Sequence, residues 1–277
     1  RGSESGFMWF ISPYPEASGA TVRAFEWQGG KIPRVVFSTY PEIAPLLEAS
    51  SIPHEFFVLG LSRKQLAVFA CKDGACTEIE PPADLPFKLG EIENIEHACA
   101  DRHRIARREQ HLWARVAAGF RRKFGDAKVV LIGVEAERRS FRAAAGTDLH
   151  IIGEVAGSPD GLPISQVEKK ALAAVAVGHA SAAESLFEND READRIAPLI
   201  DVREICDAAI EGRVHRLYVR VATQFLGRLD PAVTSVTGDE DLISAAVASA
   251  LRTGGDVIPV PAKSMNLGTP LAAVLRY

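Results

Sequence analysis

The sequence predicts an α/β protein whose strands form mixed sheets covered by helices. Two observations lead to this fold class: a meander of three strand-like segments precedes alternating helix and strand patterns, and a later block alternates helices with strands again. The 277 residues suggest about two domains. Hydrophobic residues make up 47% of the chain and charged residues 25%, close to the globular average. Disordered, collagen-like and coiled-coil chains are therefore excluded.

The first 50 residues predict a short N-terminal region. Its expected elements are a strand at 21–27, a glycine turn at 29–30, a strand at 32–38 and a helix at 41–49. The apolar stretch at 7–11 is too short for the core of a signal peptide, and no segment approaches the roughly 20 apolar residues of a membrane span. We therefore expect a cytoplasmic protein that does not bind a membrane.

Residues 51–160 predict a middle domain. Its expected elements are strands at 56–61, 65–71 and 76–80, a helix at 101–124, a strand at 128–134, a helix at 135–145 and a strand at 149–155. Lys72-Asp73-Gly74 is a hairpin signal, and the apolar residues of 101–124 recur at helical spacing. The order β-β-β-α-β-α-β resembles an RNase H-like layout, a mixed sheet covered by helices.

Residues 161–277 predict a C-terminal domain, a compact α/β/α sandwich. Two Gly and two Pro in 156–163 mark the preceding linker, so we place the domain boundary within 156–165. Ser165 and Glu168 form a capping box for a helix that runs to about 188. The remaining expected elements are a helix at 191–211, a strand at 215–221, a helix at 239–253 and strands at 256–261 and 270–277.

Charge is unevenly distributed along the chain. The net charge of −4 and the pI near 6.0 exclude a globally basic nucleic-acid binder. Residues 101–123 nevertheless carry eight Arg or Lys against Asp101 and Glu109. Spacings of 4, 7 and 7 residues place a set of four arginines in one exposed row, namely Arg104, Arg108, Arg115 and Arg122. This row is either a solvated helix face or a surface that contacts RNA phosphates, which guanidinium groups bind bidentately.

The common catalytic motifs are absent. The sequence has no G-x-G-x-x-G between a strand and a helix, no P-loop and no nucleophile elbow. The expected strands 56–61, 65–71 and 128–134 contain no Asp or Glu, so a two-metal nuclease site is not expected.

Cysteines are too sparse for a disulfide framework, and we interpret Cys71 and Cys76 as small buried hydrophobes. His179 and His215 are interpreted as structural. We expect no metal and no cofactor.

The C-terminal residues carry a family resemblance. Helix residues Glu240-Asp241-Leu242-Ile243 and the following alanines lead to a Gly-Gly turn, a strand and a terminal strand, in residues 251–261 and 271–277. This pattern resembles the end of the bacterial archaeo-eukaryotic release factor family, relatives of the archaeal/eukaryotic class-1 release factor and Pelota. The resemblance implies a release-factor third domain, similar to kink-turn-binding ribosomal proteins. Residues 57–69, 128–133 and 151–153 resemble parts of the family's second domain and the junction that follows it.

One departure from the family bears on function. Release factors hydrolyse peptidyl-tRNA with a Gly-Gly-Gln tripeptide, which this sequence lacks; between Glu80 and Arg104, where the loop is expected, the only glycine is Gly90. We therefore expect a non-catalytic, ribosome- or tRNA-associated translation factor of the release, rescue or hibernation type, with a translational GTPase as a partner of the C-terminal domain.

Two alternatives stay open. One is a peptidyl-tRNA hydrolase whose catalytic loop is missing from this chain, which begins Arg1-Gly2-Ser3 without Met. The other is a protein-binding module unrelated to the ribosome, acting through the acidic C-terminal domain. Whether the protein is an enzyme stays undecided between these interpretations.

Overall fold

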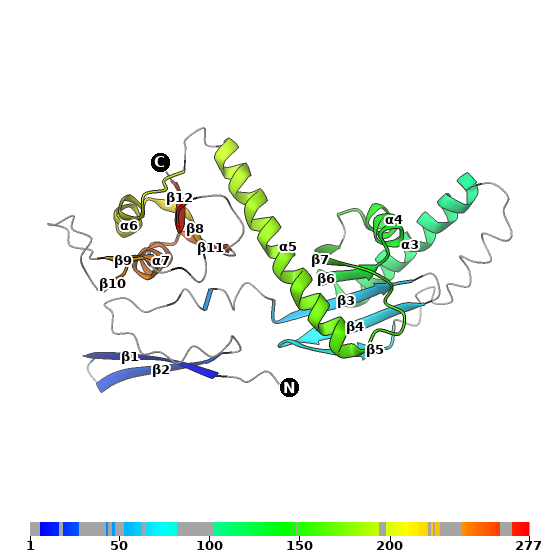
Figure 1. Cartoon of the computed structure of the whole chain (residues 1–277), viewed down its shortest axis with the longest axis horizontal. Coiled ribbons are helices and arrows are strands. Elements are labelled where there is room, and N and C mark those ends of the chain that lie inside the picture. Colours follow the sequence, from blue (N-terminus) through cyan, green and yellow to red (C-terminus); the bar gives the residue numbers. More distant parts are fainter. Residues whose placement is uncertain are drawn as a thin grey trace. The chain divides into compact units, whose positions relative to one another are not determined.

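The computed structural model contains two compact units, shown in Figure 1. It describes residues 6–16, 19–27, 43, 46–47, 53–62, 65–81, 102–147, 149–193, 198–220, 223, 225–227, 240–260 and 268–276. One unit, the middle unit, comprises Ile52–His179. The other, the C-terminal unit, joins Arg1–Ser51 to Ala180–Tyr277.

The N-terminal segment forms a β-hairpin. Strand β1 (Gly6–Glu16) pairs antiparallel with β2 (Gly19–Trp27). The sequence predicted the second strand and missed the first. Residues 46–47 are helical, within the helix expected at 41–49, whereas the strand expected at 32–38 lies outside the described residues.

A five-stranded mixed sheet forms the centre of the middle unit. The strands are β3 (Glu55–Leu61), β4 (Leu66–Lys72), β5 (Ala75–Ile79), β6 (Lys128–Gly133) and β7 (His150–Ala156). Their order in the sheet is β5-β4-β3-β6-β7. The first three form an antiparallel meander, while β6 runs parallel to both β3 and β7. The mixed sheet expected from the sequence is thus confirmed.

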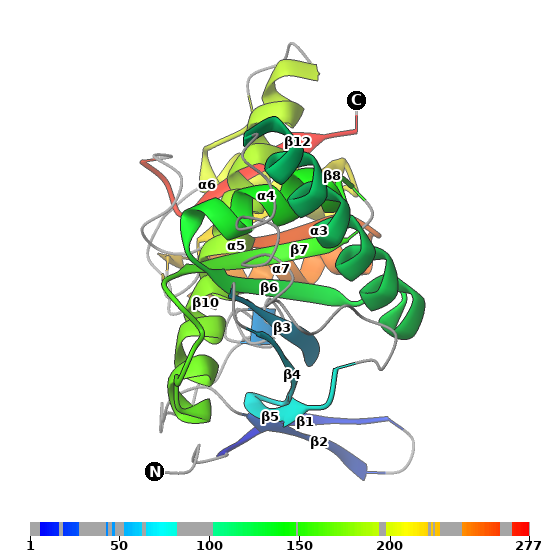
Figure 2. The same cartoon turned by 90° about the vertical axis from the view of Figure 1, so that its right-hand side faces the viewer.

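Helices cover both faces of this sheet. Helices α3 (Arg102–Phe124) and α4 (Glu135–Ala145) lie side by side over one face (Figure 2). Their core includes Trp113, Phe120 and Phe141, all fully buried. The first half of α5 (Ile164–Ala193) covers the other face, where Val167 and Ala171 are fully buried.

Helix α5 approaches strand β7 at backbone contact distance. A Cβ atom added at Gly178 would lie 1.8 Å from the carbonyl oxygen of Ile152, and one added at Gly153 would lie 2.7 Å from that of Ala174. Only glycine permits this approach, since real Cβ atoms do not come closer than about 3 Å to other heavy atoms. The two compact units divide inside α5, between His179 and Ala180, and the domain boundary expected within 156–165 stays a prediction.

A second, smaller sheet forms the centre of the C-terminal unit. Strand β8 (Val214–Arg220) lies between β11 (Asp256–Val260), which is parallel to it, and β12 (Leu271–Leu275), which is antiparallel. Helices α6 (Val202–Ile210) and α7 (Leu242–Arg252) pack on one face. On the other face, Ala183 and Phe187 of α5 pack against Tyr218. A two-stranded ladder, β9 (Leu226–Gly227) with β10 (Glu240–Asp241), precedes α7.

The helix expected at 191–211 is two separate elements. Helix α5 continues to Ala193, and α6 begins only at Val202. Between them, Leu199 forms an antiparallel bridge with Ala273 beside β12. The side chain of Asp201 caps α6 by accepting hydrogen bonds from the amides of Arg203 and Glu204, at 2.9 and 3.1 Å.

The interpretation of Cys71 and Cys76 as separate buried thiols is wrong. The two residues face each other directly across β4 and β5, and their sulfurs form a disulfide. The turn between the strands places Asp73 and Gly74 at positive φ, 49° and 84°, which brings the two cysteines opposite each other. Both are buried, as expected, whereas Cys99 lies outside the described residues.

Candidate nucleic-acid interface on helix α3

Helix α3 forms because its apolar residues fall on one side. The buried members of this stripe are Leu112, Trp113, Val116, Ala117 and Phe120. They recur every three or four residues and pack against the sheet and α4. The helix ends where Gly125 takes a φ of 61° and donates its N–H to the carbonyl of Arg121 at 2.7 Å.

The predicted arginine row lies on the solvent side of this helix. Arg108, Arg115 and Arg122 are all exposed, and Arg104 belongs to the helix, although its side chain lies outside the described residues. Seven residues are about 10.5 Å of helix and nearly two full turns, so successive arginines stand almost in line. The exposed row spans about 21 Å from Arg108 to Arg122.

Helix α3 itself contains few carboxylates. Glu109 is the only acidic residue of α3, and the first turn contains none. Among the described residues, no ion pair involves Arg108 or Arg115. The last turn contains Arg121, Arg122 and Lys123, which also suit the negative end of the helix dipole. The face is therefore a strip of positive charge.

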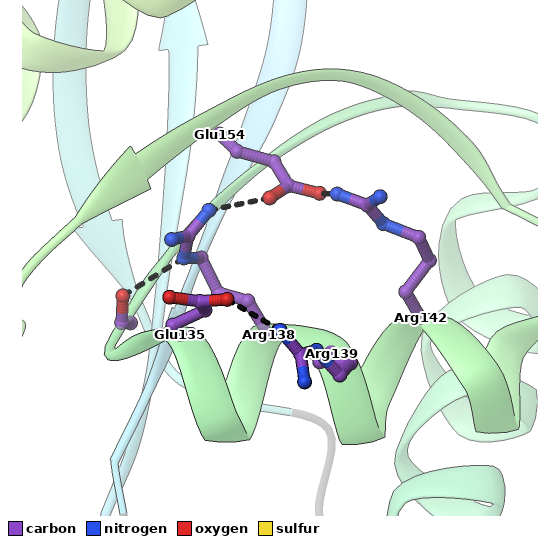
Figure 3. A network of polar contacts seen from close by, with 6 residues as sticks. Glu135, Arg138, Arg139, Arg142 and Glu154 are labelled. Atoms are coloured by element: carbon purple, nitrogen blue, oxygen red, sulfur yellow. Dashed lines mark hydrogen bonds and ion pairs between the residues drawn. The ribbon is translucent and has the colours of Figure 1, made fainter.

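Helix α4 also carries arginines, but each faces a carboxylate (Figure 3). Arg139 contacts Glu135 one turn earlier at 2.5 Å. Arg138 reaches Glu154 of β7 at 2.5 Å and donates its Nε–H to the carbonyl of Gly133 at 3.0 Å. Arg142 pairs with the other carboxylate oxygen of Glu154. The α4 arginines are thus neutralised within the protein.

The aromatic residues of α3 are directed inward. Trp113 is fully buried and meets Phe141 edge-on at 6.0 Å between ring centroids. Phe120 and Phe124 pack against Phe57 at 5.7 and 4.3 Å. Trp113 and these phenylalanines therefore belong to the core. Of the described rings on α3, only the imidazole of His111 is classed as exposed.

The other candidate groups from the sequence are a metal cluster, the two histidines and the catalytic loop. Among them, no group of three or more His, Cys, Asp or Glu could hold a metal ion. His179 is half-buried on α5, where burial and the charge of Lys128 lower its pKa. His215 is exposed. Residues 82–101 belong to the stretch where a catalytic loop is expected in the family, and they lie outside the described residues.

The family-like residues at the C-terminus hold α7 in place. Asp241 caps the helix by accepting from the amide of Ile243 at 3.3 Å and the hydroxyl of Ser244 at 2.7 Å. Gly254 has a φ of 75°, and a Cβ at Gly255 would lie 3.0 Å from the carbonyl of Val214. Arg276 donates to the carbonyl of Thr253 at 3.0 Å. The Gly-Gly turn and the terminal Arg therefore have structural roles.

A partly buried charge network in the C-terminal unit was not predicted from the sequence. Asp190 of α5 accepts two hydrogen bonds from Arg216, at 2.5 and 2.7 Å, and one from the hydroxyl of Tyr218 at 2.6 Å. Burial favours a higher pKa for Asp190, but the bonds from Tyr218 and Arg216 and the positive charge of Arg216 lower it overall. The i, i+2 spacing of Arg216 and Tyr218 on β8 was the available signal.

A second buried group lies beside α6 and α7. Burial raises the pKa of the Cys206 thiol to about 12, with smaller contributions from Asp207, Asp241 and Asp201. The thiol donates to the carbonyl of Leu242 at 3.4 Å. Cys206 is thus buried, with its thiol directed at a backbone carbonyl of α7.

The chain was compared with protein families, curated proteins and solved structures. No family model and no curated protein matches it. It is similar to Pelota of Archaeoglobus fulgidus, with a TM-score of 0.44 and 12% identity over 94% of this chain and 78% of that one. It is similar to S. cerevisiae Dom34, described as a translation termination-like factor interacting with Hbs1, with a TM-score of 0.47 and 10% identity over 94% and 75%.

A third solved structure is the archaeal translation termination factor aRF1, with a TM-score of 0.33 and 13% identity over 92% of this chain and 73% of that one. Membership of the bacterial family stays a prediction. No described helix combines the length and apolar character that crossing a membrane requires.

Proposed function

We propose that this protein is a non-catalytic translation factor of the release, rescue or hibernation type, which binds the ribosome or tRNA through helix α3. The observation that carries the proposal is the exposed row of Arg108, Arg115 and Arg122 on a helix with a single carboxylate. Arginine binds phosphate oxygens bidentately, and contacts to the phosphate backbone dominate the affinity of RNA-binding surfaces.

Two further features support the proposal. The strand order β5-β4-β3-β6-β7, with a meander followed by two parallel strands, fits an RNase H-like middle domain that lacks strand carboxylates. The order α7, Gly-Gly turn, β11 and β12 fits the pattern of a release-factor third domain. In this proposal the C-terminal unit supplies the surface for a translational GTPase.

Co-sedimentation with ribosomes at two salt concentrations tests the proposal. The chain should pellet with ribosomes at low salt and be released as salt rises, because each neutralised phosphate returns counterions to solution on binding. Absence from the ribosome pellet at low salt would contradict ribosome binding. If tRNA also fails to bind, the proposed function is wrong, and a protein-binding module becomes the better interpretation.

A hydrolysis assay separates the proposed function from its catalytic alternative. The purified chain should not release peptide from peptidyl-tRNA on the ribosome, since the sequence has no Gly-Gly-Gln. Turnover that a point mutation in this chain abolishes would establish an enzyme instead. A longer natural sequence with Gly-Gly-Gln between Glu80 and Arg104 would favour the same alternative.

A further inference from the structure

The exposed face of α3 combines two properties that together restrict the kind of RNA it can recognise. It presents guanidinium groups at regular intervals, and its described side chains from Arg107 to Phe124 include one exposed ring, that of His111. We infer that this face binds the phosphate backbone of double-stranded RNA and discriminates against unpaired strands. The inference rests on the proposed function and specifies the RNA structure that its binding surface contacts.

The first step concerns the bases. Single strands are held by successive aromatic side chains on which unpaired bases stack, and each base contributes substantially to affinity. On α3, Trp113 and Phe120 are fully buried, and Phe124 packs against Phe57. Among the side chains of α3 that the structure describes, His111 offers one exposed ring, which is too few for a series of stacked bases. The face therefore lacks the platform that unpaired strands use.

The second step concerns shape. The major groove of an A-form duplex is too deep and narrow for a helix to read, so proteins contact such RNA through phosphates and 2′-hydroxyls across the minor groove. The straight row from Arg108 to Arg122 spans about 21 Å. A rigid, paired backbone presents phosphates at fixed positions along this distance, whereas an unpaired strand must be ordered first.

The third step concerns what competes for the arginines. In α4, carboxylates already occupy Arg138, Arg139 and Arg142. Within the described part of the chain, Arg108 and Arg115 have no such ion pair. Phosphates can therefore bind these two α3 arginines without displacing a carboxylate of the described residues. Because the contacts reach no base edge, binding should be independent of sequence.

Fluorescence anisotropy with the full chain tests the inference. The probes are a blunt RNA duplex of about 16 base pairs, the length that dsRNA-binding domains cover, and a uridine-only single strand with the same number of phosphates. We expect at least about fivefold tighter binding to the duplex, and equal binding to duplexes of different sequence. The Arg108→Glu/Arg115→Glu/Arg122→Glu variant should lose the preference for duplex.

A second variant shows whether stacking is the missing element. Ala118 is exposed between Arg115 and Arg122, so Ala118→Trp adds a ring to the face, and Ala118→Leu is the control for added bulk. The Trp variant should bind the single strand at least about fivefold tighter than wild type and the duplex unchanged. The Leu variant should match wild type on both probes.

The outcomes separate this inference from the function on which it rests. Equal or tighter binding of the wild type to the single strand would overturn the inference, as would failure to bind either probe. If the inference fails in this way but the triple variant still loses ribosome binding, the proposed function remains supported. If ribosome binding is unaffected by the triple variant, the proposed role of α3 fails instead.

Discussion

Helices α3 and α4 lie on the same face of the same sheet, and both are rich in arginine, yet their arginines differ in their partners (Figures 2 and 3). Arg138 and Arg142 share Glu154, and Arg138 is only 15% exposed. Arg108 and Arg115 are exposed and form no ion pair among the described residues. The number of arginines in a helix therefore indicates its role less well than whether those arginines form ion pairs with carboxylates. We expect α4 arginines to stabilise the fold and α3 arginines to bind RNA.

The largest expected effect is on binding through α3. Arg108→Glu/Arg115→Glu/Arg122→Glu should weaken ribosome binding about 100-fold or more at low salt, since three phosphate contacts become repulsive. The apolar stripe is untouched, so the melting temperature should change little. Equilibrium binding to ribosomes and thermal unfolding measure the two quantities.

The matched control reverses three exposed charges elsewhere, Lys169, Lys170 and Arg252. Lys169→Glu/Lys170→Glu/Arg252→Glu changes the net charge by the same amount and should retain most of the binding. Equal losses in both variants would mean that total charge, and not the α3 face, determines binding. That result would contradict the claim that α3 arginines bind RNA while α4 arginines stabilise the fold.

The second effect is on stability through α4. Arg138→Ala should lower the free energy of unfolding by about 1–3 kcal/mol, because it leaves the largely buried Glu154 with one fewer charged hydrogen bond. Arg139→Ala, in the same helix, removes an exposed pair and should cost no more than about 0.5 kcal/mol. Urea denaturation measures both. A similar cost for the two variants would contradict the distinction between buried and exposed pairs.

These two helices also show what sequence reasoning could and could not find. The α3 stripe and its arginine row were predictable, because both follow from spacing within one helix. The pair between Arg138 and Glu154 joins residues 16 apart in different elements, so only the packing of α4 against β7 brings them together. The disulfide of Cys71 and Cys76 was missed although the hairpin was expected, because register across the turn decides whether two cysteines face each other.

The division of the chain into two compact units was not predictable for a related reason. The Gly- and Pro-rich stretch 156–163 is typical of a linker, but here it connects β7 to a helix that packs back on the same sheet. Gly153 and Gly178 carried the missing signal, since each permits close approach of two backbones. A single sequence does not distinguish such a packing glycine from a turn glycine.

The third prediction extends the comparison to a paired arginine in the C-terminal unit, Arg216. The pKa of Asp190 is lowered in the folded state, so its interactions stabilise the fold above its ordinary pKa of about 4. That stabilisation should be lost as pH falls through the lower, folded-state pKa. Asp190→Asn should therefore be about 1–3 kcal/mol less stable than wild type at pH 6.

Urea unfolding of both proteins between pH 6 and pH 2.5 measures this difference. The gap between wild type and Asp190→Asn should narrow steadily below about pH 4. A constant gap over the whole range would show that Asp190 does not titrate as its partners require. Asp207→Asn, at an exposed position on α6, is the control for the loss of a surface carboxylate.

The smallest expected effect comes from a variant that leaves α4 arginines without a carboxylate partner, as in α3. Glu154→Gln removes the carboxylate that faces Arg138 and Arg142 and leaves both guanidinium groups with a neutral partner. The affinity for ribosomes should rise about two- to threefold at low salt, and the gain should disappear as salt is raised. Glu135→Gln is the matched control at an exposed pair. A fall in affinity with an intact fold would argue against internal neutralisation as the difference between the helices.

The salt dependence of ribosome binding tests the central claim most directly. The logarithm of the association constant should fall linearly with the logarithm of salt concentration for the wild type, and each phosphate contact should contribute about 0.7–0.9 to the slope. In the Arg108→Glu/Arg115→Glu/Arg122→Glu variant, the slope should be shallower by about 2–3. A folded variant with the affinity and slope of the wild type would contradict the claim and leave the α3 arginines as a solvated surface.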